Sequence, residues 1–354
     1  MSRFFSEKYA DLEPYVPGEQ PQDRVYVKLN TNENPFPPHP AVTDAAQAES
    51  RRLNLYSDPE CWELRRAMAK RIGLSEDQLI MTNGSDEILN FAFMAFCDLH
   101  TPAVFADITY AFYPVFAQIN QVPFREIPVK EDLRVDPKDY YQAAGTIFIA
   151  NPNAPTGYAL TREEMEGILE QNPYNVVVVD EAYVDFGAES IAPLVREYDN
   201  LLVVQTFSKS RSLAGGRLGF GIGNQEIIRD LEAVRYSVNP YNVNRMTAAA
   251  GVACLEYDDY NRKNSLVIQD NRRWTERALR KLGFEMTESM ANFVFVRHPD
   301  VEGETLYREA KKRGVLIRHF NVERIRDYSR ITIGTREQME QLIETFKEIL
   351  GVKA

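Results

Sequence analysis

Short apolar runs rich in β-branched residues alternate with amphipathic segments along the first two thirds of the chain. The apolar runs predict strands at 79–81, 103–105, 146–150, 176–179 and 201–204. The segments between and before them predict helices at 41–53, 62–72, 88–96, 111–119 and 162–171. The four valines at 176–179 are typical of a strand buried on both faces. This alternation predicts a parallel α/β sheet whose ligand lies at the carboxyl ends of the strands.

The pattern changes after residue 225. Helices are predicted at 226–234, 245–255, 262–281, 304–313 and 336–350, with strands at 293–297 and 330–333, which indicates a smaller α+β domain. Residues 1–27 are polar and rich in proline, so we expect an arm that lies on the small domain or on a partner subunit. We therefore predict an N-terminal arm (1–28), a large domain (29–255) and a small C-terminal domain (256–354).

Polar residues follow the predicted strands of the large domain. Ser85, Asn153, Asp180 and Lys209 each come after a different strand, so we expect them to converge at one edge of the sheet. The segment 82–87 turns through a glycine into a helix N-terminus, which is a natural anion site. The alternative is a simple N-cap by serine or aspartate.

Lys209 lies at the mouth of the 201–204 strand, although lysine strongly resists full burial. Its neighbours are two hydroxyl residues, a glycine pair and an arginine: Thr206, Ser208, Gly215, Gly216 and Arg217. Hydroxyl donors, close backbone approach and a positive charge together favour a phosphate ligand. A lysine beside bound phosphate predicts pyridoxal phosphate (PLP), whose aldehyde forms a Schiff base with an amine. The alternative is an ordinary solvated loop lysine.

Three further residues fit this cofactor. Asp180 is placed to stabilise a protonated pyridine nitrogen, and Tyr183 to hydrogen-bond the phenolic oxygen O3′. Tyr110 could stack on the flat ring, although such a tyrosine is more often packing. Lys209 would serve as the general base when its amine is free.

Composition narrows the classes of partner. The 354 residues carry 41 Lys+Arg against 52 Asp+Glu, a net charge of −11, which argues against nucleic acid. No signal core opens the chain, and no stretch approaches the roughly 18–20 apolar residues that span a bilayer, so we expect a cytoplasmic protein without membrane contact. The three cysteines and four histidines show no ligand spacing, so neither a disulfide framework nor a metal site is expected.

The motifs at 206–209 with Arg217, at 180–183 and at 151–157 resemble the class I/II aminotransferases of PLP fold type I. Within that class the chain is most similar to the histidinol-phosphate aminotransferase family, through the segments 14–18, 28–35, 56–59, 83–87, 240–244, 292–294 and 330–334. The resemblance implies a large domain with a mostly parallel seven-stranded sheet flanked by helices, a smaller α+β domain, and a homodimer with its sites at the subunit interface.

The resemblance also implies residue roles. Lys209 would carry PLP, Asp180 would pair with the pyridinium, Tyr183 would bind O3′ and Tyr110 would stack on the ring. The phosphate would be held by Gly84, Ser85, Asp86, Thr206, Ser208 and Arg217, with Tyr56 of the partner subunit. Arg330 would bind the α-carboxylate of glutamate, and Arg318 would join it on the phosphate of the other substrate, with Tyr15 and Asn32 nearby.

The implied reaction transfers an amino group from L-histidinol phosphate to 2-oxoglutarate, giving imidazole acetol phosphate and glutamate, a step of histidine biosynthesis. Threonine-phosphate decarboxylase and aromatic amino-acid aminotransferase remain alternatives on the same scaffold. A phosphate-bearing substrate predicts that Arg318 and Arg330 converge, whereas an aromatic substrate predicts an apolar pocket there. A non-catalytic PLP-binding module is a further alternative. A nicotinamide-dependent dehydrogenase is not supported, because the glycine pattern at 221–226 is incomplete.

The chain departs from the family at two places. Ala154 stands where an asparagine usually bonds O3′, and we consider Asn153 as its substitute. Ser210 and Arg211 follow the lysine where a small and then an aromatic residue are common. Arg211 adds a cation of unknown role, and the ordinary alternative is a solvated or salt-bridged arginine.

Overall fold

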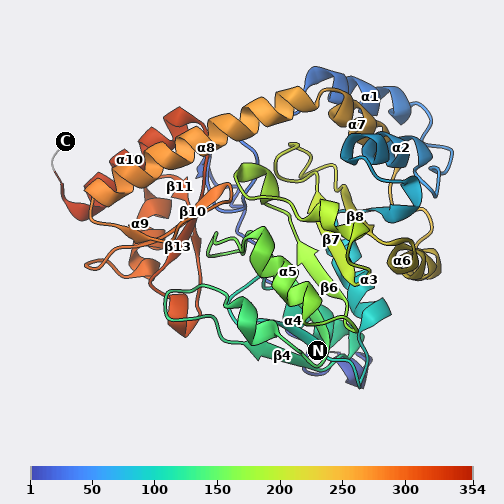
Figure 1. Ribbon diagram of the computed structural model, residues 1–354. Helices are drawn as coiled ribbons and strands as arrows, with labels where there is room; N and C mark the ends of the chain where they lie inside the picture. Colours follow the sequence, from blue (N-terminus) through green and yellow to red (C-terminus); the bar gives the residue numbers. More distant parts are fainter. Residues whose placement is uncertain (1, 353–354) are drawn as a thin grey trace.

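A seven-stranded sheet forms the centre of the larger part of the molecule (Figure 1). The structure, a computed structural model, describes residues 2–352. The strand order is β2-β8-β7-β6-β5-β3-β4, and β8 runs antiparallel to both of its neighbours while the other pairs are parallel. The strands are β2 (Leu79–Thr82), β3 (Ala103–Ala106), β4 (Phe124–Ile127), β5 (Thr146–Ala150), β6 (Val177–Asp180), β7 (Leu201–Thr206) and β8 (Gly219–Gly223). The predicted mostly parallel seven-stranded sheet is confirmed.

Helices cover both faces of this sheet, because successive side chains of each strand point to opposite sides. Val177 and Val179 pack into one apolar cluster with α2 (Trp62–Ile72), α5 (Arg162–Glu170) and α7 (Arg245–Glu256). Val178 packs into the other cluster, with α3 (Ser85–Phe96), α4 (Tyr113–Asn120) and α6 (Gln225–Val238). Every residue of β5, β6 and β7 is buried, as the continuous apolar runs predict. Helix α1 (Pro40–Ser50) lies against α7.

The C-terminal part contains an antiparallel sheet of order β12-β13-β10-β9. The strands and helices of this C-terminal part are β9 (Glu285–Met286), β10 (Phe293–Arg297), α9 (Gly303–Lys312), β11 (Val315–Leu316), β12 (Arg318–His319), β13 (Ser329–Thr332) and α10 (Arg336–Leu350). Helix α8 (Asp258–Lys281) runs from α7 to this sheet (Figure 1). Its 24 residues make it about 36 Å long, so it connects the two cores physically.

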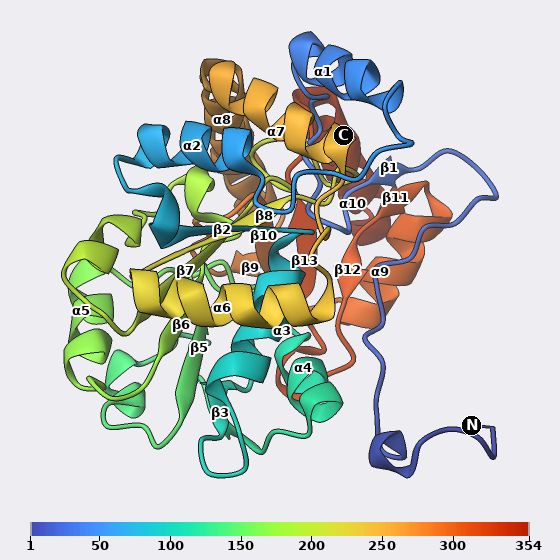
Figure 2. The ribbon, with the colours of Figure 1, turned by 90° about the vertical axis from the view of Figure 1, so that its right-hand side faces the viewer.

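The end of the N-terminal arm lies on the C-terminal part (Figure 2). Strand β1 (Val27–Lys28) pairs in parallel with β11, and the guanidinium of Arg24 donates to the carbonyl of Lys312 at 2.9 Å. Leu29, one residue further, is part of the C-terminal apolar cluster. The domain boundaries at residues 28 and 255 stay predictions. No helix among residues 2–352 has both the length and the apolar character that crossing a bilayer requires.

Candidate active site

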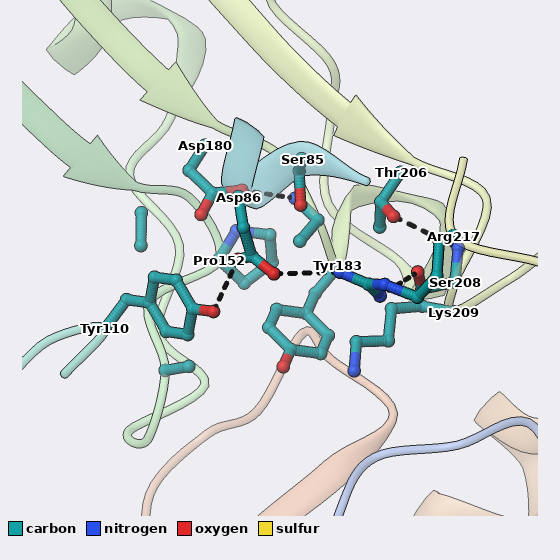
Figure 3. A pocket seen from close by; sticks show the side chains of 13 residues that line it. Ser85, Asp86, Tyr110, Pro152, Asp180, Tyr183, Thr206, Ser208, Lys209 and Arg217 are labelled. Atoms are coloured by element: carbon teal, nitrogen blue, oxygen red, sulfur yellow. Dashed lines mark hydrogen bonds and ion pairs between the residues drawn. The ribbon is translucent and has the colours of Figure 1, made fainter. Parts of the chain in front are cut away.

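A pocket opens at the carboxyl ends of β5, β6 and β7, where the sequence predicts a ligand (Figure 3). Nine predicted residues line it: Ser85, Asp86, Tyr110, Asp180, Tyr183, Thr206, Ser208, Lys209 and Arg217. Four residues that were not predicted complete the lining: Ala150, Pro152, Ala154 and Ala182. The convergence follows from topology, because parallel strands end at one edge of the sheet.

One end of the pocket is rich in hydrogen-bond donors. Gly84 is the N-cap of α3, so the first N–H groups of that helix have no partner within it and point their positive dipole end toward the pocket. The Arg217 guanidinium donates to Asp86 Oδ2 at 3.0 Å and lies 3.5 Å from Ser208 Oγ. A Cβ added to Gly84 would come within 2.6 Å of that guanidinium, and Gly84 has φ +79°. A glycine is therefore required for this cradle.

Asp180 ends β6 and is only 6 % exposed. Its carboxylate accepts hydrogen bonds from the Ala182 N–H at 3.0 Å and from the Tyr113 hydroxyl at 3.5 Å. Burial raises the pKa of Asp180 to about 7, and the nearby charge of Asp86 acts in the same direction. A buried carboxylate in this state lacks a strong counter-charge, which a protonated pyridine nitrogen would supply.

Lys209 follows β7 and its side chain reaches toward Tyr183. The ammonium donates to the Thr31 carbonyl at 3.4 Å, and Nζ lies 5.6 Å from the centroid of the Tyr183 ring. The Tyr183 hydroxyl in turn accepts a hydrogen bond from Asn32 Nδ2 at 2.9 Å. The amine, the phenol and the amide come from segments far apart in sequence, so tertiary structure alone brings them together.

Tyr110 closes the pocket from the segment between β3 and α4. Its hydroxyl donates to Asp86 Oδ1 at 2.7 Å, and its ring meets that of Tyr113 edge-on at 5.7 Å. Burial raises the pKa of Tyr110 well above its ordinary value, so the phenol remains a neutral donor. Asp86 thus accepts from both Tyr110 and Arg217.

Two arginines stand opposite each other in the antiparallel β12–β13 pair. Arg318 and Arg330 are register partners, and side chains at opposite positions share one face of a sheet. Arg330 Nη2 donates to the Asn30 carbonyl at 3.3 Å, while its Nε is buried and has no hydrogen-bond partner among the described residues. Burial lowers the pKa of Arg330, and the charge of Arg318 adds to this effect. Like charges so placed repel, and an anion would relieve both the repulsion and the unmet donor.

The placement of Asn153 corrects our expectation. Its Nδ2 donates to the Ile108 carbonyl and to Thr156 Oγ1, both at 3.0 Å, and its Oδ1 accepts from the Thr109 hydroxyl at 2.7 Å. The side chain lines a neighbouring cavity instead of the pocket, because adjacent residues point in different directions. The expectation that Asn153 takes the place of the missing asparagine is therefore wrong. Ala154 itself faces the pocket and brings no polar atom.

Like Asn153, the predicted residues Gly84, Arg318 and Arg330 are not part of the pocket lining, and three more also lie outside it. Tyr56 is 78 % exposed and stacks on Tyr241 with ring centroids 4.5 Å apart, so a role in a partner subunit stays a prediction. Tyr15 packs on Phe112 at 4.5 Å. Asn32 is held by Thr332, whose hydroxyl accepts from the Asn32 N–H at 2.9 Å, and reaches the site through Tyr183.

Sequence reasoning missed Tyr113. It is fully buried at the start of α4, and its hydroxyl faces Asp180. The available signal was its position three residues after Tyr110, which places both rings near the same helix start. That signal does not distinguish a polar contact from ordinary aromatic packing.

Comparison with known proteins agrees with this geometry. Residues 24–346 match the family model described as aminotransferase class I and II. The histidinol-phosphate aminotransferase 1 of Bordetella parapertussis is 48 % identical over 99 % of this chain and 100 % of its own length. Histidinol-phosphate aminotransferase 1 of Bradyrhizobium diazoefficiens is 47 % identical, again over 99 % of this chain and 100 % of its own length.

A solved structure from the same group of enzymes has a similar fold. The crystal structure of histidinol-phosphate aminotransferase from Sinorhizobium meliloti, in complex with pyridoxal-5′-phosphate, has a TM-score of 0.89 and 23 % identity, and the match covers 100 % of this chain and 99 % of that one. The chain belongs to the class I and II aminotransferases, which are transferases of fold type I. Pyridoxal phosphate is the cofactor of this family, and the donor cradle and the buried Asp180 fit it.

Proposed function

We propose that this enzyme transfers an amino group from L-histidinol phosphate to 2-oxoglutarate, giving imidazole acetol phosphate and glutamate in histidine biosynthesis. The observation that supports this most directly is the pairing of Arg318 with Arg330. The guanidinium of Arg330 lies over the Phe293 ring, which meets the ring of the pocket residue Tyr183 edge-on. Histidinol phosphate has no α-carboxylate but carries a phosphate, which two guanidinium groups bind through several charge-assisted hydrogen bonds. The names of full-length relatives up to 48 % identical support the same substrate.

We assign the cofactor contacts to this chain's residues as follows. PLP, when bound, supplies an aldehyde that condenses with amines and a ring that takes up electron density. Lys209 would hold it covalently, Asp180 would keep the pyridine nitrogen protonated, and Tyr183 would donate to O3′. The phosphate is held at the start of α3 and around Arg217, by Gly84, Ser85, Asp86, Thr206, Ser208 and Arg217.

The free Lys209 amine then acts as the general base. It would take the proton from the substrate Cα and carry it on Nζ as an ammonium that can give it back during the transfer. The Lys209 amine lies in the pocket beside the Tyr183 ring, so a substrate bound there would be within short reach of it for proton transfer. Arg330 orients either substrate, through the phosphate of histidinol phosphate or through the α-carboxylate of glutamate. Arg318 adds a contact to the phosphate.

We further propose a homodimer in which Tyr56 reaches the phosphate of the partner's cofactor. The exposed Tyr56–Tyr241 pair supports this, because large exposed aromatic side chains are enriched at interfaces. A cytoplasmic location remains our expectation for a biosynthetic enzyme of this kind.

A single-turnover experiment tests the substrate. PLP-loaded protein is mixed with L-histidinol phosphate in the absence of any oxo acid. We expect the absorption band of the lysine-bound cofactor to disappear and one equivalent of imidazole acetol phosphate to be released per site. An unchanged band in protein that does respond to glutamate or phenylalanine would overturn the substrate while leaving the aminotransferase class intact. Release of carbon dioxide from threonine phosphate would instead identify the decarboxylase.

The Lys209→Ala variant tests the residue assignment. We expect it to fold normally and to lose turnover, with the band of the lysine-bound cofactor absent. Normal turnover by the folded variant would contradict the assignment of Lys209 as the residue that carries the cofactor.

A further inference from the structure

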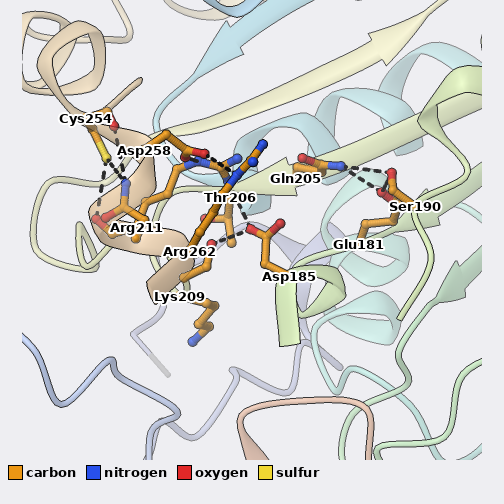
Figure 4. Close-up of polar contacts among 12 residues, drawn as sticks. Glu181, Asp185, Ser190, Gln205, Thr206, Lys209, Arg211, Cys254, Asp258 and Arg262 are labelled. Atoms are coloured by element: carbon orange, nitrogen blue, oxygen red, sulfur yellow. Dashed lines mark hydrogen bonds and ion pairs between the residues drawn. The ribbon is translucent and has the colours of Figure 1, made fainter. Parts of the chain in front are cut away.

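The two residues that follow Lys209 form a buried polar network (Figure 4). Arg211 is 8 % exposed, and its Nη1 lies 3.3 Å from Asp185 Oδ2. The hydroxyl of Ser210, which is also buried, donates to the same carboxylate oxygen. On its other side Arg211 faces Asp258, with Nε 3.8 Å from Oδ1. A cation and a hydroxyl from the lysine segment therefore converge on Asp185.

Asp185 belongs to the segment that carries Tyr183. It lies in the 3-10 turn Val184–Phe186, directly after that tyrosine. Asp258 is the first residue of α8. The network thus ties the Lys209 segment to the Tyr183 segment on one side and to the helix that reaches the C-terminal sheet on the other.

Arg211 is distinguished by its contact with Asp185. Asp258 also pairs with Arg71 and with Arg262, whose Nε is 3.0 Å from Oδ2, so its charge is compensated without Arg211. Among the ion pairs of residues 2–352, Asp185 has Arg211 as its cation. The guanidinium also stands over the Phe207 ring at 5.1 Å, which fixes its plane.

The backbone around Lys209 is restrained in the same region. Asn34 Nδ2 donates to the carbonyls of Lys209 and Ser210, both at 3.1 Å, and the Leu213 N–H donates to the Phe207 carbonyl at 3.0 Å. These bonds hold the main chain, and the 31–34 segment they come from also reaches Tyr183 through the Asn32 amide. The direct side-chain link between the Lys209 segment and the turn that follows Tyr183 runs through Asp185.

We propose that Arg211 is a positioning residue that, through Asp185, fixes the Lys209 segment relative to Tyr183. This rests on the proposed role of Lys209 in carrying the cofactor. Covalent attachment and proton transfer both depend on placing the amine to within a fraction of an ångström, so a directional guanidinium contact two residues away controls that placement. Arginine suits the task because its planar fork donates to Asp185 through Nη1, while Nε faces the Asp258 carboxylate at 3.8 Å without a hydrogen bond.

The test uses Asp185→Asn as the main variant. The Asp185 side chain is 39 % exposed, so the amide itself reaches solvent, and the buried Arg211 still faces the Asp258 carboxylate at 3.8 Å. The second variant is Arg211→Lys, which keeps the charge and removes the fork. Arg262→Gln is the matched control, because it pairs with Asp258 and is 65 % exposed. Thermal unfolding is followed for all three.

Two readouts separate positioning from stability: the pH midpoint of the lysine-bound cofactor's absorption, and kcat separately from KM for the amino donor. The charged or titratable groups that face Lys209 are unaltered in these variants: Glu33, Tyr110, Asp180, Tyr183 and Arg217. We expect Asp185→Asn and Arg211→Lys to shift the midpoint by roughly half a pH unit or more and to lower kcat by about tenfold, with KM within about twofold. Arg262→Gln should match wild type.

In the double variant kcat should be no lower than in the less active of the two single variants, since both changes break the same link. An unchanged midpoint and kcat in Asp185→Asn, or a loss of kcat that only follows the fraction of folded protein, would overturn the proposal. Failure of the proposed role of Lys209 is distinguishable, because wild-type protein would then show no cofactor band that Lys209→Ala removes. Failure of the proposed substrate is distinguishable too, because the wild-type band would be present but would not respond to L-histidinol phosphate.

Discussion

Arg318 and Arg330 occupy directly opposite positions of an antiparallel strand pair, yet their further contacts differ. Arg318 donates to the carbonyls of Val16 at 2.9 Å and Pro17 at 3.2 Å, which lie in the N-terminal arm. Arg330 lies deeper, near the rings of Phe293 and Phe320. Arg318 is therefore held by the N-terminal arm, whereas Arg330 is held among aromatic rings of the C-terminal part.

This difference predicts different substrate effects. Arg330→Gln should lower kcat/KM for both histidinol phosphate and glutamate by about 10- to 100-fold, since a hydrogen bond to a charged group contributes about 1.5–3 kcal/mol. Arg318→Gln should do so for histidinol phosphate while leaving glutamate within about threefold. Arg297→Gln, on the neighbouring strand and paired with Glu285, is the control. Equal losses for both substrates in Arg318→Gln would contradict a specific phosphate contact and indicate an effect through the arm.

The raised pKa of Asp180 predicts how the cofactor-free protein responds to pH. Its folded pKa of about 7 exceeds the unfolded value near 3.9, so the folded apoprotein binds more protons and loses stability as pH rises between these values. The loss for this one group is of the order of 4 kcal/mol. Buried Glu181, whose pKa is also raised to about 7, acts in the same direction.

Chemical denaturation of the apoprotein at pH 5 and pH 8 measures this effect. We expect Asp180→Asn to reduce the difference between the two pH values and PLP to reduce it in wild type, because a pyridinium supplies the counter-charge. Glu181→Gln is the comparison that removes the second group without touching the pocket. If the difference in unfolding free energy between pH 5 and pH 8 were the same in Asp180→Asn as in wild type, the pKa of Asp180 would not be raised in the apoprotein.

Much of this architecture could be predicted from the sequence, because buried strands and the polar residues that end them are local signals. The strand Thr146–Ala150 and the helix Trp62–Ile72 agree with their predicted bounds. Strand β8 gives only a weak signal because Gly219, Gly221 and Gly223 dilute its apolar pattern. The fold requires the first of these glycines, since a Cβ on Gly219 would come within 2.5 Å of the backbone at the start of α3.

The errors at the site concern side-chain direction. Neither the turn of Asn153 away from the pocket nor the contact between Tyr113 and Asp180 is encoded in local spacing. The link from Arg211 to Asp185 joins segments 26 residues apart, so the sequence could offer a salt-bridged arginine as an alternative but could not name its partner.

Tyr113→Phe tests the contact that the sequence did not reveal. The change removes one hydroxyl from a fully buried ring and keeps the packing. Asp180 would lose a hydrogen bond that lowers its pKa, so its charged form and its pyridinium pairing would weaken. We expect kcat to fall by about 3- to 10-fold, corresponding to about 1 kcal/mol, with an altered absorption spectrum of the bound cofactor. Tyr140→Phe, a buried tyrosine outside the pocket lining, controls for the loss of a hydroxyl, and equal spectra in wild type and Tyr113→Phe would argue that the contact is packing alone.

Gly84→Ala tests the phosphate cradle. The methyl group would meet the Arg217 guanidinium at 2.6 Å and would also strain a residue with φ +79°. We expect the Kd for PLP, measured by titration of the apoprotein, to rise by at least about tenfold, because Arg217 must move away from its place beside Ser208. Gly314→Ala is the matched control, since it has φ +90° but no atom within 4 Å of the added methyl group. It should lower the free energy of unfolding by about 1 kcal/mol through backbone strain and leave the Kd for PLP unchanged. A similar rise in Kd for both variants would mean that general destabilisation, and not the displaced guanidinium, weakens cofactor binding.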